Sequence, residues 1–280
     1  MPPTVAELCT DLAAEHAALD TVVAGVPAAA WATATPAAGW DVRDSISHLC
    51  FFDESATLAL TEPDGFETHK GLLLAAMAEV DAAGPAAGGS AASGASTPDV
   101  ALGRELPTPA ALLDRWRAGR AAYLDAAAAS APAYPGRRIP WYGPPMSVAS
   151  FTTARLMETW AHGADIRDAL GVPLDASPRL RHIVHIGVTA RPYAFAAHGV
   201  TDPGAPIRVE AAGPDGTTWT WGPPEAPDRV TGSALDLALL LTQRRHRSHT
   251  GVTAEGPLAE EWLAIAQAFA GPPTITDPSR

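Results

Sequence analysis

The stretch 151–170, FTTARLMETWAHGADIRDAL, decides the expected fold, because it has the features of one long helix. Ser147 can cap its start, and Gly171 stands where a helix commonly ends. Apolar residues occur on several sides, so we expect the helix to be largely enclosed by the rest of the chain. One stripe at helical spacing is nevertheless mostly ionisable and needs partners: Phe151, Arg155, Glu158, His162 and Asp165.

Within that stripe, Glu158 and His162 are four residues apart and can direct an oxygen and a nitrogen at one point. Such a pair is half of a metal site. It is also a common local hydrogen bond on a solvated helix face, and this helix alone does not separate the two interpretations. A further ligand from a second helix would favour the metal.

The stretch 40–53, WDVRDSISHLCFFD, predicts that second helix. Asp41 can cap it, with Asp44 in a capping-box position three residues later. His48 then lies in the helix interior, where a histidine is by default a core or surface residue. As metal ligands, the two helices would supply three side chains: His48, Glu158 and His162. Three protein ligands with an open fourth position are typical of catalytic rather than structural zinc.

These two motifs, W-D-V-R-D-x-x-x-H and, further along, E-T-W-A-H-G-x-D-I-R-D-A-L-G, resemble the mycothiol-dependent maleylpyruvate isomerase family. The resemblance implies an α+β protein, with a DinB-like four-helix metal-binding bundle followed by a small α/β domain similar to sterol carrier proteins. It also implies that His48, Glu158 and His162 hold the metal. Zinc is expected, although nickel or iron would suit the same donors.

The resemblance implies a thiol chemistry as well. In the isomerases of this family, mycothiol is the cosubstrate, and its thiolate adds to an activated cis double bond that rotates before elimination. We therefore expect an isomerase or S-transferase that acts on a small unsaturated or electrophilic metabolite. A hydrolase or lyase using metal-bound water stays open, as does a non-catalytic metal-stabilised scaffold that binds a ligand.

Three arginines are candidate catalytic residues. Arg155 lies one turn before Glu158, where it would orient a substrate carboxylate or, alternatively, form an ion pair with Glu158 or Asp165. Arg244 and Arg245 belong to the stretch QRRHR, and the resemblance implies an activity-requiring arginine in this region. If the segment is helical, only one of these two neighbours faces the bundle. The alternative is favourable charge at the C-terminal end of a helix.

The overall composition excludes several classes of partner. A formal net charge of −12 argues against nucleic acid and anionic membrane surfaces. No apolar run reaches the ~20 residues that a membrane span needs. Cys9 and Cys50 are the only cysteines, and no signal peptide is evident, so we expect reduced thiols in a cytoplasmic protein. Cys50 is more simply a buried, inert thiol than a nucleophile. A monomer or a homodimer is expected.

Periodicity divides the chain at the segment after Gly171, into a helical bundle over 1–173 and a small α+β domain over 174–280. Helices are expected at 4–23, 42–60, 66–80, 108–129, 179–198, 233–245 and 257–269, and strands at 206–211, 217–221, 229–231 and 251–254.

Four features between or within these elements carry expectations of their own. Residues 62–65 are expected to form a turn, and the Gly/Ala/Ser-rich stretch 81–100 predicts a loop, either a lid or a linker. The aromatic residues Trp141 and Tyr142 are candidates for a pocket wall or for a plain connection. A solvated helix face is the simplest account of Arg115, Arg117 and Arg120.

Overall fold

The structure, a computed structural model, describes residues 2–83, 97–133 and 136–269. The chain divides into two compact units, Met1–Leu174 and Asp175–Arg280. Long helices dominate the first unit, and a sheet with helices forms the second, which confirms the α+β fold class. The expected likeness of the second unit to sterol carrier proteins stays a prediction.

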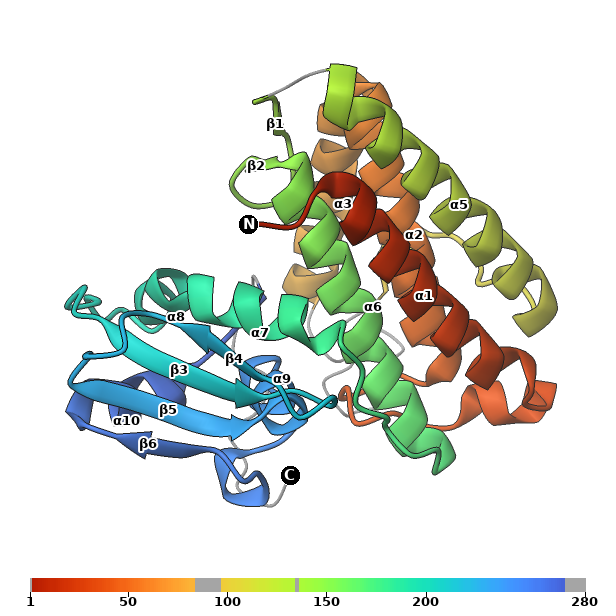
Figure 1. Ribbon diagram of the computed structural model, residues 1–280. Coiled ribbons are helices and arrows are strands. Elements are labelled where there is room, and N and C mark those ends of the chain that lie inside the picture. Colours follow the sequence, from red (N-terminus) through yellow and green to blue (C-terminus); the bar gives the residue numbers. More distant parts are fainter. Residues whose placement is uncertain (1, 84–96, 134–135, 270–280) are drawn as a thin grey trace. The chain divides into compact units, whose positions relative to one another are not determined.

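Four long helices build the bundle of the N-terminal unit (Figure 1). Two of them, α1 and α2, each pack against both of the others, so that four apolar faces meet in one core. Leu49, Trp116 and Ile166 are among its fully buried side chains. Burying a side chain of this size stabilises the fold by about 1.5–3 kcal/mol. The helices are α1 (Val5–Ala24), α2 (Val42–Thr61), α5 (Pro109–Ala133) and α6 (Val148–Leu170).

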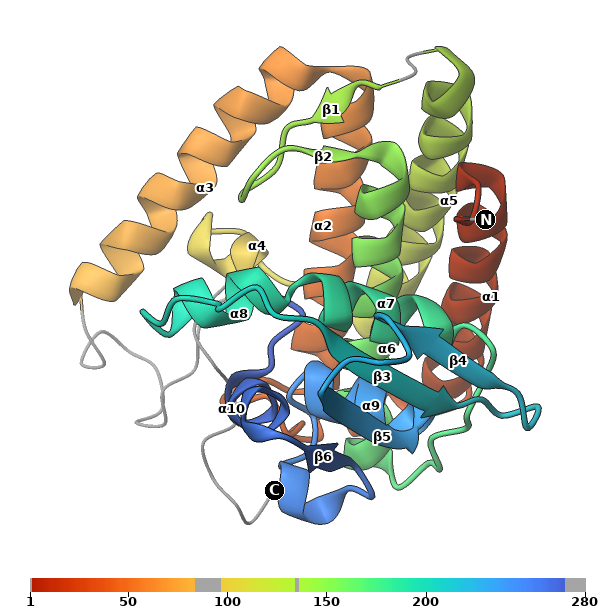
Figure 2. The same cartoon turned by 60° about the vertical axis from the view of Figure 1, so that its left-hand side comes forward.

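A further helix, α3 (Pro63–Ala83), runs beside one end of α2 and then diverges from the bundle (Figure 2). The turn expected at 62–65 is wrong, because proline is well suited to the first turn of a helix and α3 begins there. The short helix α4 (Pro98–Ala101) packs against α2 and α3. Most of the expected lid, 84–96, lies outside the described residues. Two short strands, β1 (Arg138–Ile139) and β2 (Met146–Ser147), pair just ahead of α6.

The C-terminal unit contains a four-stranded sheet in the order β4-β3-β5-β6. The central strands β3 and β5 are parallel, and each edge strand pairs antiparallel with its neighbour. Inward-facing residues of β3 and β5 alternate with half-exposed ones, as expected for a sheet with one covered face. The strands are β3 (Ile207–Ala212), β4 (Thr218–Trp221), β5 (Asp228–Ser233) and β6 (Thr253–Glu255).

The helices of the C-terminal unit correct two expectations. The single helix expected at 179–198 is wrong: it breaks at Ala190, just before Pro192 opens the next helix. The helix expected at 233–245 ends at Leu241, and Gln243 adopts a left-handed backbone with φ of 57°. The helices are α7 (Leu180–Thr189), α8 (Arg191–Ala197), α9 (Ala234–Leu241) and α10 (Pro257–Ile265). Among the described helices, none is both long and apolar enough to cross a membrane.

Candidate metal centre

The two helices that carry the expected ligands begin at well-defined caps. On α2, the Asp44 backbone N–H donates to the Asp41 side chain at 2.8 Å, and the Asp41 N–H donates back to Asp44 at 3.1 Å. On α6, the Ser150 backbone N–H donates to the hydroxyl of Ser147 at 3.1 Å, and Gly171 ends the helix with φ of 65°. These caps fix where each helix begins, and thereby which residues face the partner helix.

Where α2 packs against α6, three side chains converge: His48, Glu158 and His162. The distance from Glu158 Oε2 to His48 Nε2 is 3.6 Å, and to His162 Nε2 it is 3.5 Å. All three candidate ligand atoms lie within 4.8 Å of one another. Two ligands that are each about 2.1 Å from a tetrahedral zinc ion are about 3.4 Å apart, so the observed spacing and donor types fit such an ion.

The protonation states of the site also suit a cation. Burial lowers the pKa of His48 to about 4, and the neighbouring His162 acts in the same direction. Burial on its own raises the pKa of Glu158, but the hydrogen bonds from His162 and His48 outweigh it and hold the pKa well below its usual range. At neutral pH the site therefore presents a neutral His48 and an ionised Glu158, which are the forms that bind divalent metals.

Two neighbours fix the imidazole rings. Asp165 Oδ2 lies 3.5 Å from His162 Nδ1, on the side of the ring away from Glu158. A carboxylate in this position orients a ligating histidine and raises its basicity. The indole of Trp40 stacks on His162 at 5.6 Å between centroids and lies 5.0 Å from the His48 ring. Asp165 and Trp40 thus orient the two histidines without belonging to the group of candidate metal ligands.

Aromatic rings flank the other side of His48. The Phe52 ring lies 4.6 Å from the His48 ring, and it also contacts the rings of Trp141 and Tyr142 at 5.8 and 5.3 Å. Trp141 packs in turn against Phe151 of α6 at 4.7 Å. The segment 141–142 is therefore part of the surroundings of the candidate site.

Arg155 occupies a different environment from either of those expected. It is 2% exposed, and its guanidinium pairs with the fully buried Asp53 at 2.9 Å and donates to the Leu49 carbonyl oxygen at 3.4 Å. The expected ion pair with Glu158 or Asp165 is not the one formed. His16 completes this layer, with its Nε2 atom 3.8 Å from the second Asp53 oxygen. Arg155 is therefore part of a buried polar layer of the bundle.

Arg244 and Arg245 lie beyond the end of α9, in the turn that follows the left-handed Gln243. The argument that a helix orients only one of them fails, because the segment is not helical. Both side chains are half-buried, and each donates to a nearby backbone carbonyl oxygen at 2.8 Å. Arg247 forms an ion pair with Glu260 of α10. The catalytic role of Arg244 or Arg245 stays a prediction.

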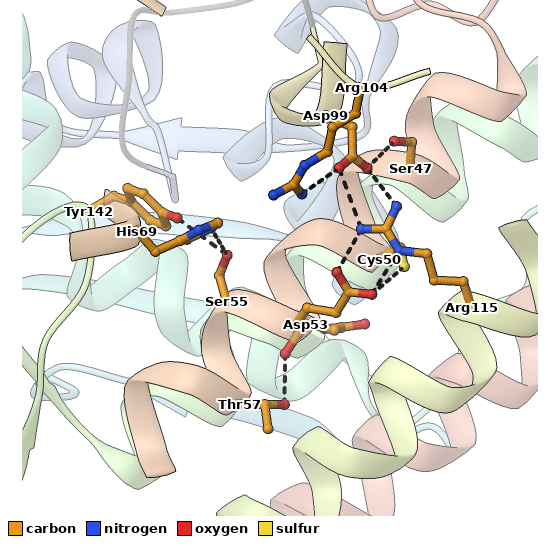
Figure 3. A network of polar contacts seen from close by, with 11 residues as sticks. Ser47, Cys50, Asp53, Ser55, Thr57, His69, Asp99, Arg104, Arg115 and Tyr142 are labelled. Carbon is orange, nitrogen blue, oxygen red and sulfur yellow. Dashed lines mark hydrogen bonds and ion pairs between the residues drawn. The ribbon is translucent and has the colours of Figure 1, made fainter. Parts of the chain in front are cut away.

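A second polar network lies on another face of α2, and sequence reasoning did not find it (Figure 3). Arg115 of α5 pairs with Glu54 at 2.7 Å and with Asp99 of α4 at 2.9 Å. The buried Asp99 also accepts from the Ser47 hydroxyl at 3.2 Å, so the network attaches α4 to the bundle. The solvated-face account of Arg115 is wrong.

The other two arginines of that face are also paired rather than merely solvated. Arg117 and Arg120 of α5 both bond Asp20 of α1, at 2.7 and 2.5 Å. Cys50, next to the Arg115 network, is fully buried, and burial raises the pKa of its thiol. The expectation of an inert Cys50 thiol agrees with this environment.

Residues 12–167 match the family model for the mycothiol maleylpyruvate isomerase N-terminal domain. The chain belongs to this family. It is 47% identical over 263 residues to an uncharacterized protein of Mycobacterium tuberculosis, found in two strains as Rv0036c and MT0041. That match covers 94% of this chain and 95% of the relative.

The fold is also similar to a solved structure. The crystal structure of the mycothiol-dependent maleylpyruvate isomerase, and that of a histidine-to-alanine mutant of it, each align with a TM-score of 0.55 at 14% sequence identity. The alignment covers 92% of this chain and 96% of the solved chain, so the likeness of fold extends through both units. Mycothiol-dependent isomerase is the activity that names both the family and the solved structure.

Proposed function

We propose that this protein is a divalent-metal-dependent thiol enzyme, a mycothiol-dependent isomerase or S-transferase that acts on a small electrophilic or unsaturated metabolite. The observation that carries the proposal is the convergence of His48, Glu158 and His162 between α2 and α6. Membership of the mycothiol maleylpyruvate isomerase family supports the choice of thiol. Zinc is the proposed metal, because two imidazoles and one carboxylate suit it and leave a fourth position open.

A bound zinc ion would stabilise the thiolate of a cosubstrate at neutral pH, where a free thiol with a pKa of about 8.5 is mostly protonated. The chain's own residues have three tasks around that chemistry. Glu158 supplies a negative charge to the cation, and His48 and His162 supply imidazole nitrogens. Asp165 and Trp40 keep the two rings oriented.

An anionic substrate would also need a positively charged side chain to bind it. Arg155 is unsuitable, because its guanidinium is buried and bound to Asp53. Arg244 or Arg245 of the C-terminal unit is proposed for this task, since a fixed guanidinium binds carboxylates well.

The direct test is thiol binding to the cobalt-substituted full-length protein. Mycothiol should produce a sulfur-to-cobalt charge-transfer band that saturates at about one equivalent, and the His162→Ala variant should not. Because Cys50 is a buried thiol of α2 itself, a Cys50→Ala variant is the matched control and should keep the band. A metal-loaded protein that shows no spectral change at millimolar thiol would refute the thiol enzyme and leave water activation or a scaffold.

A further inference from the structure

One side of α2 carries functional groups well beyond the candidate metal centre. Phe52 and Ser55 follow His48 by four and seven residues, so all three lie on one stripe of the helix. At 1.5 Å per residue, Ser55 is about 10 Å further along the axis than His48. Phe52 lies between them and is half-buried.

Ser55 is the centre of a three-residue polar array, which Figure 3 shows at the junction of α2, α3 and the 141–142 segment. The Tyr142 hydroxyl donates to Ser55 Oγ at 3.3 Å, and the same oxygen lies 3.3 Å from His69 Nε2. Ser55 is only 3% exposed, whereas Tyr142 and His69 are half-buried. The buried serine thus connects two side chains that reach the surface.

The direction of these hydrogen bonds leaves a donor available at the surface. With Tyr142 as donor to Ser55, the serine proton can bond Nε2 of a neutral His69, whose ring proton is then on Nδ1. Burial lowers the pKa of His69, which favours this neutral form. The Phe51 ring, 5.2 Å from the imidazole, keeps it in place. A ligand with oxygen acceptors could therefore bond His69 Nδ1 without displacing any of these contacts.

Aromatic rings bridge the distance between this array and the metal ligands. Phe52 contacts His48 at 4.6 Å on one side and Tyr142 at 5.3 Å on the other, and Trp141 lies edge-on to it at 5.8 Å. Small-molecule sites commonly combine such apolar surface with a few polar groups that set orientation. The aromatic rings would take the flat, less polar part of a ligand. The Tyr142 oxygen would accept a hydrogen bond from a ligand hydroxyl, and His69 Nδ1 would donate one to a ligand oxygen.

We infer that Phe52, Trp141, Tyr142, Ser55 and His69 form a subsite for the hydroxyl-rich body of the thiol cosubstrate, about 10 Å along α2 from the metal ligand His48. The inference rests on the proposed function, because it assumes that the sulfur binds at the metal. It goes further in assigning the recognition of the rest of the thiol to residues of the N-terminal unit. A thiol that lacks a body of this length would reach the metal but not the subsite.

The test compares two thiols on the cobalt-substituted full-length protein. Mycothiol carries a sugar body, and N-acetylcysteine carries the thiol without it. Tyr142→Phe removes only the hydroxyl, and His69→Phe replaces the imidazole by an apolar ring. Each variant should weaken mycothiol binding, read from the charge-transfer band, about fivefold, the loss expected for one neutral hydrogen bond. N-acetylcysteine affinity should stay within twofold of wild type.

Tyr123→Phe is the matched control, because it removes the same hydroxyl from a buried tyrosine that bonds Thr152 elsewhere in the bundle. It should leave both affinities unchanged. If Tyr142→Phe and His69→Phe weaken both thiols equally, or neither, the subsite is refuted while the thiol enzyme stands. If neither thiol gives a band with the wild-type protein, the proposed function fails and the subsite fails with it.

Discussion

Replacing Arg155 by methionine separates a structural role for this arginine from substrate binding. Arg155 and Asp53 are 2% and 0% exposed, and the guanidinium makes contacts of 2.9 and 3.0 Å to one Asp53 oxygen. Removing the cation leaves a carboxylate buried without its counter-charge, which costs about 3–5 kcal/mol. In a unit of this size, each kcal/mol shifts the melting temperature by about 2–4 °C. We therefore expect Arg155→Met to lower the melting temperature by about 10 °C.

Thermal unfolding of the metal-loaded protein, followed by circular dichroism, measures this loss. The double variant Asp53→Asn/Arg155→Met removes both charges, and it should recover at least half of the lost stability, because no uncompensated ion stays buried. Metal content checks that the bundle still forms the site. A single variant with unchanged melting temperature but weakened binding of an anionic substrate would refute the structural role of Arg155.

Three further predictions concern pH, metal affinity and the C-terminal unit. Burial lowers the pKa of His16 from 6.5 to about 4. As the pH falls, His16 is therefore protonated in the unfolded chain before it is protonated in the folded protein. The free energy of unfolding should decrease by about 3 kcal/mol between about pH 6.5 and pH 4. Denaturant titrations at several pH values measure this decrease. A His16→Gln variant whose free energy of unfolding decreases as steeply with falling pH as that of the wild type would contradict the prediction. Trp40→Ala should weaken metal binding about tenfold, measured by competition with a chelator. Trp40→Phe should weaken it much less, because an aromatic ring against both histidines is retained. Equal metal affinities of both variants and the wild type would argue against a positioning role for Trp40. Arg244→Gln and Arg245→Gln, made separately, should impair turnover in at least one of the two variants with metal content intact. Normal turnover in both would exclude a catalytic role for either arginine.

Local signals were sufficient to predict most of the helices. Ser147 and Gly171 delimit α6, and Asp41 with Asp44 begins α2, because each of these residues acts on backbone groups within a few positions of itself. The convergence of His48 on Glu158 and His162 was predicted from helical spacing together with the family resemblance. The structure places these atoms within reach of one ion.

Contacts between distant parts of the sequence could not be predicted in the same way. The partner of Arg155 is Asp53, 102 residues away, and the array of Tyr142, Ser55 and His69 joins three separate segments. Nothing in the spacing of these residues indicates their proximity, because it depends on how α2, α3 and α6 pack. The end of α9 at Leu241 was missed for another reason. A leucine-rich run continues the helical pattern, and only the left-handed Gln243 reveals the stop.

The central claim is that His48, Glu158 and His162 bind one divalent metal. The most direct test is the metal content of protein purified without chelator, measured by inductively coupled plasma mass spectrometry. The account predicts about one equivalent of zinc in the wild-type protein, and its loss in His162→Ala and in His48→Ala/His162→Ala with the helical circular dichroism retained. Full metal occupancy in the folded double variant would contradict the claim.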